Sequence, residues 1–165
     1  MKRNTHRFLN VTLLVLAIVF AACNKVPLYP DEPILSDGSF ELLKNSIGQD
    51  TAVLIKFKFT DGDGDLGLTT ADTIPPYDKN LFVDYFQKVD GKFEKIVMPG
   101  TTDTLNFNSR IRDYTTTGAA AAQAEVELNI NISVVLADTI QFEYFVRDKA
   151  RHVSNKLSTG PIILR

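Results

Sequence analysis

The chain has 165 residues, of which 44% are hydrophobic, with 18 Lys and Arg against 20 Asp and Glu and a formal charge of −2. This charge argues against nucleic acid and anionic lipid headgroups as electrostatic partners, because both attract basic surfaces. The length is that of one domain with a short leader, and no internal repeat is present.

Residues 1–22 have the order of a secretory signal peptide. Three basic residues among the first seven precede an apolar run over 8–20, which ends at Ala21 and Ala22. A membrane-spanning helix is the alternative, but it needs about 20 consecutive apolar residues. This run is shorter and is interrupted by Asn10 and Thr12. Removal of the leader leaves 15 basic against 20 acidic residues, a formal charge of −5.

Cys23 is the only cysteine in the chain, so no intramolecular disulfide can form, although export leads to an oxidising compartment. A single cysteine directly after small residues resembles the bacterial lipobox, in which the thiol is diacylglycerated and signal peptidase II cleaves before it. Phe20 departs from the leucine that is usual three residues earlier. The resemblance predicts a lipoprotein held on the outer membrane by its acyl chains, facing the periplasm or the cell surface.

Residues 23–37 are predicted to be a tether between the lipidated cysteine and the domain. Three prolines between positions 24 and 36 favour an extended, semi-rigid chain. The alternative is an ordered first edge strand around Pro33 to Leu35.

Residues 38–165 show alternation of apolar and polar residues with a period of two, which is typical of half-buried strands. Asp90-Gly91 lies between two apolar runs and predicts a tight hairpin turn. About seven short strands without a long amphipathic helix indicate an all-β, two-sheet antiparallel sandwich. The region 98–123 is polar and weakly patterned, with one further strand proposed at 105–111. The expected strands cover 39–44, 53–59, 81–89, 92–97, 126–134, 140–146 and 160–164.

An acidic loop, FTDGDGDLG at 59–67, directly follows one of these strands. Carboxylates at every second residue, with glycines between them, let a short loop curl so that their oxygens converge. Calcium takes six to eight oxygen ligands, whereas magnesium keeps its waters and uses fewer carboxylates. The loop therefore predicts a Ca²⁺ site, and the alternative is an ordered acidic turn without metal.

The loop partly matches the EF-hand template. A strand precedes it instead of a helix, Leu66 occupies the position of the usual glycine, and Asp72 replaces the bidentate glutamate. A second acidic residue, Asp148, follows the strand 140–146 and can reach the same pole of a sandwich; its alternative role is an Asx-type turn. The candidate metal ligands are Asp61, Asp63, Asp65, Gly67, Asp72 and Asp148, with Thr69 at the ninth position of the template.

Three segments together (FTDGDGDLG, LFVDYFQKVDGKF and DTIQFEYFVRDKARHVSN) resemble uncharacterised lipoproteins of the Bacteroidetes. The DKARHVSN turn is similar to the last turn of bacterial immunoglobulin-like and cadherin-like domains. The resemblance covers residues 50–165 loosely. It implies an immunoglobulin-like (Ig-like) fold with calcium at a strand pole, and it implies no activity.

The resemblance also implies a modification. Thr51, Thr73, Thr104 and Thr139 each follow an aspartate and precede an apolar residue, a pattern that these bacteria O-glycosylate in exported proteins. The alternative is that Asp-Thr ends a turn before a strand. Asp72 cannot easily bind metal while Thr73 carries a sugar.

Nothing in the sequence indicates an enzyme. His152 is the only histidine after the leader, and it lies within seven residues of both Asp148 and Ser154, without a nucleophile elbow. We therefore expect a non-catalytic binding or structural module that docks another envelope protein or a glycan.

Two other functions stay open. A carbohydrate-binding accessory lipoprotein of a nutrient-uptake system requires exposed aromatic residues on one face, and the candidates are Phe82, Phe86, Phe107 and Tyr114. A glycan-active enzyme would need a pair of carboxylates in a cleft.

Overall fold

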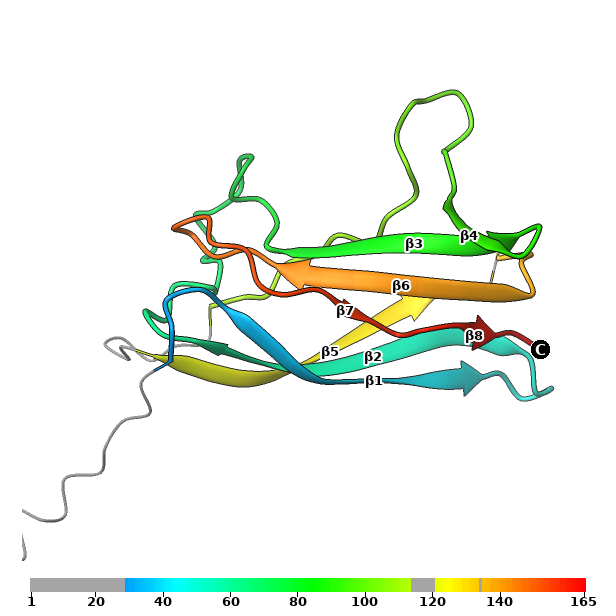
Figure 1. Cartoon of the computed structure of the whole chain (residues 1–165), viewed down its shortest axis with the longest axis horizontal. Coiled ribbons are helices and arrows are strands. Elements are labelled where there is room, and N and C mark those ends of the chain that lie inside the picture. The colour runs from blue at the N-terminus through cyan, green and yellow to red at the C-terminus, as the bar shows by residue number, and fades with distance from the viewer. Residues whose placement is uncertain (1–28, 114–120, 134) are drawn as a thin grey trace, which may run out of the picture.

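The computed structural model describes residues 29–113, 121–133 and 135–165, which form strands and no helix. In these ranges there is accordingly no helix that could cross a membrane. Figure 1 shows two layers of strands lying face to face. The strands are β1 (Ile34–Lys44), β2 (Asp50–Asp61), β3 (Leu81–Val89), β4 (Lys92–Lys95), β5 (Ala122–Asn131), β6 (Thr139–Val146), β7 (Leu157–Ser158) and β8 (Ile162–Ile163).

The strand order is that of an Ig-like sandwich. One sheet has the order β1-β2-β5, and the other has the order β4-β3-β6-β7, with β8 also pairing with β6. Every pair of strands is antiparallel. These orders correspond to strands A-B-E and C′-C-F-G of the immunoglobulin fold, in which β7 and β8 are two parts of an interrupted strand G. The predicted two-sheet antiparallel sandwich is confirmed.

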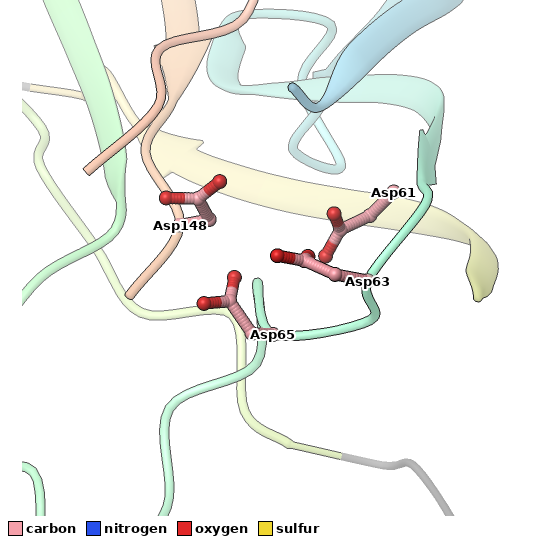
Figure 2. A group of neighbouring side chains, drawn as sticks. All are labelled: Asp61, Asp63, Asp65 and Asp148. Atoms are coloured by element: carbon pink, nitrogen blue, oxygen red, sulfur yellow. The ribbon is translucent and has the colours of Figure 1, made fainter. Parts of the chain in front are cut away.

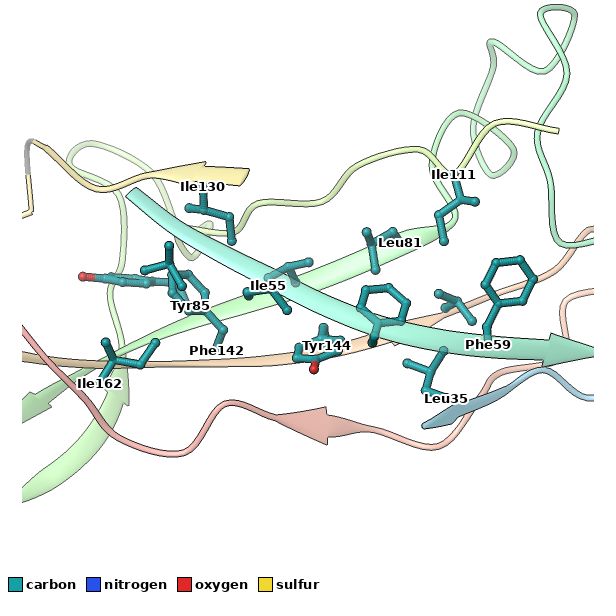
Figure 3. Close-up of a cluster of buried hydrophobic side chains, with 14 of the residues drawn as sticks. Leu35, Ile55, Phe59, Leu81, Tyr85, Ile111, Ile130, Phe142, Tyr144 and Ile162 are labelled. Carbon is teal, nitrogen blue, oxygen red and sulfur yellow. The ribbon is translucent and has the colours of Figure 1, made fainter. Parts of the chain in front are cut away.

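The alternation of side chains explains why these segments pair. In β2, Ile55 and Phe57 are buried while Lys56 and Lys58 lie on the other face. The same alternation in β3 and β6 supplies the opposing wall, and the inward side chains of both sheets meet in a single core (Figure 3). The ring of Phe57 lies 5.1 Å from that of Tyr144 across the sheets. Burial of this apolar area is the main source of the stability of the sandwich.

The predicted hairpin turn is also confirmed. Asp90 and Gly91 have φ angles of 49° and 84° and join β3 to β4. Two successive positive φ angles define a type I′ turn, whose twist matches that of the flanking strands.

The first and last strands differ from the expectation. β1 begins at Ile34, so residues 34–37, which the sequence predicts as the end of the tether, belong to an edge strand. This part of the chain follows the alternative prediction. The last strand is divided at Gly160, which has a φ angle of 66°, and at Pro161, which has no N–H to donate to the ladder.

Two further segments also differ. The strand proposed at 105–111 is reduced to isolated bridges beside β3, at Asn106 and Ser109. β5 begins at Ala122, earlier than expected, while 118–120 lie outside the described residues.

The same substitution at two leucines tests this assignment of core and surface. Leu81 is 2% exposed between the sheets, whereas Leu136 is 97% exposed. We expect Leu81→Ala to lower the free energy of unfolding by about 2–5 kcal/mol and Leu136→Ala to change it by less than about 0.5 kcal/mol. Urea titrations followed by circular dichroism measure both values, and equal losses would contradict the core described above.

Candidate metal centre

Four carboxylates converge at one pole of the sandwich. β2 and β6 belong to different sheets and both end at this pole, as their arrowheads in Figure 1 show. Asp61, Asp63 and Asp65 lie at and after the end of β2, and Asp148 follows β6. One carboxylate oxygen from each residue lies within 4.8 Å of the others, and the four side chains point toward a common centre (Figure 2).

The loop after β2 curls because it is attached to the core. Leu66 is fully buried, and its N–H donates a hydrogen bond to Asp61 Oδ2 at 2.8 Å. Gly64 has a φ angle of 71°, which glycine adopts without steric cost. Leu66, the departure from the EF-hand template, therefore has a structural role: it anchors the loop so that three aspartates face inward.

The turn after β6 forms the second wall of the cluster. Asp148 accepts hydrogen bonds from the backbone N–H of His152 at 2.7 Å and from the ring of His152, which lies 2.8 Å from Oδ2. Asp65 accepts hydrogen bonds from the backbone N–H groups of Lys149 and Ala150, at 3.3 and 3.0 Å. Asp148 thus caps its own turn, as the Asx alternative predicts, and also faces the loop.

Asp61 is the most buried of the four aspartates, and further negative charges surround it. Its side chain is fully buried, and among the described residues Oδ1 has no hydrogen-bond partner. Burial raises the pKa of this carboxyl to about 6, against the lowering by the Leu66 N–H. The adjacent Asp63 carboxyl and the negative charges of Asp63 and Asp65 also raise this pKa. Burial and the charges of Asp148 and Asp63 likewise raise the pKa of Asp65. A metal ion at the centre of the group would offset both the burial and the repulsion.

Only part of the template is brought together. Asp72 accepts hydrogen bonds from the N–H and hydroxyl of Thr69, at 2.7 and 2.8 Å, and does not join the four-carboxylate group. The chain leaves the loop because the backbone of Leu68 pairs with that of 111–113. Gly67 packs against this segment, where a Cβ would lie 2.5 Å from Asp113 Cα.

One residue that supports the site carries no signal in the sequence. Asn80 is 1% exposed, and its amide donates hydrogen bonds to the carbonyl oxygens of Leu66 and Ile111, at 2.6 and 3.0 Å. Its Oδ1 accepts a hydrogen bond from the Ile111 N–H at 2.7 Å. Asn80 thereby ties the acidic loop to the segment before β5, a contact between three distant parts of the chain.

The remaining candidate sites are scattered. Thr51 is in β2 and donates its hydroxyl to the Leu43 carbonyl at 3.2 Å, and Thr104 and Thr139 are half-buried. Among the threonines of the Asp-Thr pattern, Thr73 alone is exposed. Cys23 lies outside the described residues.

A Ser-His-Asp triad needs two hydrogen bonds, one between Asp and His and one between His and Ser. Among Asp148, His152 and Ser154, the structure has only the first. His152 Nδ1 contacts Asp148, and this contact raises the pKa of the imidazole. The Ser154 hydroxyl instead donates to the Asn155 carbonyl at 2.8 Å and accepts from the Val146 N–H at 3.0 Å. Ser154 is therefore engaged with the backbone on both sides of the turn.

Fold and site together define an Ig-like antiparallel sandwich with four carboxylates at one pole that can hold a metal ion. No family model, no curated protein and no solved structure matches this chain. The resemblance to Bacteroidetes lipoproteins stays a prediction from the sequence.

The raised pKa of Asp61 predicts a pH dependence of stability in calcium-free protein. The folded state binds this proton more tightly than the unfolded chain, so stability falls as the pH rises between the ordinary value of 3.8 and about 6. From pH 5 to pH 7 we expect a loss of about 1 kcal/mol, measured by urea titration in chelator.

Asp61→Asn keeps the shape of this side chain and removes its charge. The carboxylates of Asp63, Asp65 and Asp148 still face the position, and His152, whose raised pKa acts in the same direction, stays in place. The variant should therefore reduce the pH dependence without abolishing it. An unchanged dependence would show that Asp61 is not its main source.

Proposed function

We propose that this chain is a non-catalytic envelope lipoprotein whose Ig-like domain is a binding or structural module stabilised by calcium at the acidic pole. The observation that carries the proposal is Oδ1 of the fully buried Asp61, which has no hydrogen-bond partner among the described residues and is surrounded by three further carboxylates. A buried charge without a partner is costly, and an ion at this point supplies the partner.

The donor set favours calcium among the common metal ions. The group contains only carboxylate oxygens, which suit hard cations, while zinc favours nitrogen and sulfur ligands. The one histidine nearby, His152, uses Nδ1 to contact Asp148. Calcium also tolerates irregular geometry and incomplete protein ligation, whereas magnesium demands a near-ideal octahedron. Waters would complete the coordination on the side of Asp63, which is exposed.

The lipoprotein part of the proposal rests on the sequence. The basic and apolar leader and the lipobox-like Cys23 support export and attachment to the outer membrane. β1 begins at Ile34, only eleven positions after Cys23, so lipidation would place the domain close to the membrane.

The aromatic residues give little support to the carbohydrate-binding alternative. Phe107 is partly buried against the core, with its ring centroid 5.9 Å from that of Tyr85, and Tyr114 lies outside the described residues. Phe82 is half-buried on the outer face of β3, with the guanidinium of Arg147 4.8 Å above its ring. Phe86 is likewise half-buried, with the Lys95 ammonium 5.5 Å from its centroid. Among the described candidates, only Phe82 and Phe86 lie on the outer face, and both are half-buried beside basic side chains.

Calcium should stabilise the folded chain. A ligand at 100 times its Kd raises the free energy of unfolding by about 2.7 kcal/mol, and extracellular calcium modules often have a Kd of about 10⁻⁴–10⁻³ M. Thermal melts in chelator and across a calcium titration to tens of millimolar measure the effect, and calorimetry measures the Kd.

Two matched variants locate the site. Asp63→Asn removes a charge from the cluster at an exposed position, so it should weaken calcium binding at least tenfold with little change in the stability of the calcium-free protein. Asp72→Asn keeps an acceptor for Thr69 and lies outside the cluster, so it should bind calcium like the wild type. A midpoint unmoved by calcium in the wild type, or equal losses in both variants, would remove the basis for the proposed site.

Cys23→Ser tests the anchor. The wild-type chain should incorporate labelled palmitate and fractionate with the outer membrane, because its acyl chains bind stably to lipid. The variant should lose the label and accumulate with its leader uncleaved. Labelling that persists in Cys23→Ser would contradict lipidation at this residue.

A further inference from the structure

The acidic pole also receives the segment through which the chain enters the domain, residues 29–33. The N–H of Gly62 donates a hydrogen bond to the Pro30 carbonyl at 2.8 Å. The Tyr29 hydroxyl donates to Gln123 Oε1 at 2.9 Å, and the side chain of Pro33 is buried. The entry segment therefore lies against the loop that carries three of the four aspartates.

Gly62 allows this contact by its lack of a side chain. A Cβ at this position would lie 2.3 Å from the Tyr29 carbonyl oxygen and 2.5 Å from that of Pro30. Gly62 does not have a positive φ angle, in contrast to Gly64 two residues later. Close approach of the entry segment, and not backbone conformation, is thus the reason for glycine at this position.

The turn that carries Asp148 holds the next part of the entry segment. The amide of Asn155 accepts a hydrogen bond from the Leu35 N–H at 2.8 Å and donates one to the Leu35 carbonyl at 3.0 Å. The chain from Tyr29 to Leu35 is therefore attached to both walls of the carboxylate cluster, the loop after β2 and the turn after β6.

The positions of the ligands explain how the cluster and the segment are coupled. Gly62 lies between Asp61 and Asp63, so an ion bound by both carboxylates fixes the peptide groups between them and aims the Gly62 N–H at Pro30. Without an ion, the four carboxylates repel one another and favour a more open loop. Opening of the loop moves the Gly62 N–H away from the entry segment.

We propose that a cation bound by Asp61, Asp63, Asp65 and Asp148 seats residues 29–33 on the domain, and that its loss releases them; this inference rests on the proposed calcium site. For a chain anchored at Cys23, the seated form leaves five residues (24–28) between lipid and domain, a reach of at most about 18 Å. The released form leaves ten residues (24–33), a reach of at most about 36 Å. The cation would thereby control how far the domain stands from its anchor.

Nuclear magnetic resonance relaxation of the backbone amides tests the seating directly. The sample is the ¹⁵N-labelled chain, as the cell processes it, in detergent micelles, with calcium chloride or with chelator. We expect the order parameters of the Asp31 and Glu32 amides to rise from below about 0.6 in chelator to about 0.85 with calcium.

Gly62→Ala separates the seating from the metal ligands, because it leaves all four carboxylates in place and fills the space of the Tyr29 and Pro30 carbonyls. In this variant the two amides should stay mobile with calcium. Since coupling between sites is reciprocal, the variant should also bind calcium roughly 5- to 150-fold more weakly. Tyr29→Phe loses only the hydrogen bond to Gln123. It should lower the order parameters of the two amides and the calcium affinity in the same direction, but by less than Gly62→Ala.

The outcomes distinguish the inference from the proposed function. Calorimetry that detects no calcium binding by the wild type overturns both. Calcium binding with unchanged order parameters at Asp31 and Glu32 overturns the seating alone, as does Gly62→Ala with wild-type calcium affinity.

Discussion

The carboxylate of Asp61, buried at the end of β2, is the constraint on which the acidic pole depends. A charged side chain in the interior needs a proton, a hydrogen-bond donor or an ion. The Leu66 N–H satisfies one oxygen, and the other has no partner among the described residues. Leu66, which is held in the core, and Asn80, which ties the loop to the segment before β5, fix the loop at its Leu66 end. The negative charge is therefore concentrated beside a fixed point of the fold, where four carboxylates can hold a cation.

The Ig-like strand order brings the other parts to this point. β2 and β6 lie in opposite sheets and end at the same pole, so Asp148 meets residues that precede it by more than eighty positions. β1 starts at the same pole because it is antiparallel to β2, which places the entry segment beside the loop. A rigid sandwich that supports variable loops at its poles is a common way to position a binding site. Here the same geometry places the candidate site beside the segment that leads to Cys23, the proposed site of lipidation.

Much of the fold follows from local pattern. The alternation around Ile55 and Phe57 specifies which face of β2 is buried, and Asp90-Gly91 specifies the turn between β3 and β4, because both depend on neighbours along the chain. The interruption of the last strand at Pro161 has a local cause as well, although its consequence for pairing is visible only in the sheet. The placement of Asp72 outside the cluster is only partly local, through its hydrogen bonds with Thr69. It also depends on the pairing of Leu68 with residues 111–113, more than forty positions away.

The sequence by itself determined the two-residue period of the strands, the hairpin turn and the spacing of Asp61, Asp63 and Asp65, since each is a property of adjacent residues. The tertiary structure alone decided which aspartates meet, because convergence of Asp148 with the loop depends on two sheets packing face to face. It also decided that Phe107 packs against the core and that Gly62 contacts the entry segment. These contacts join residues far apart in the chain, and the packing of the complete sandwich, not any local preference, selects them.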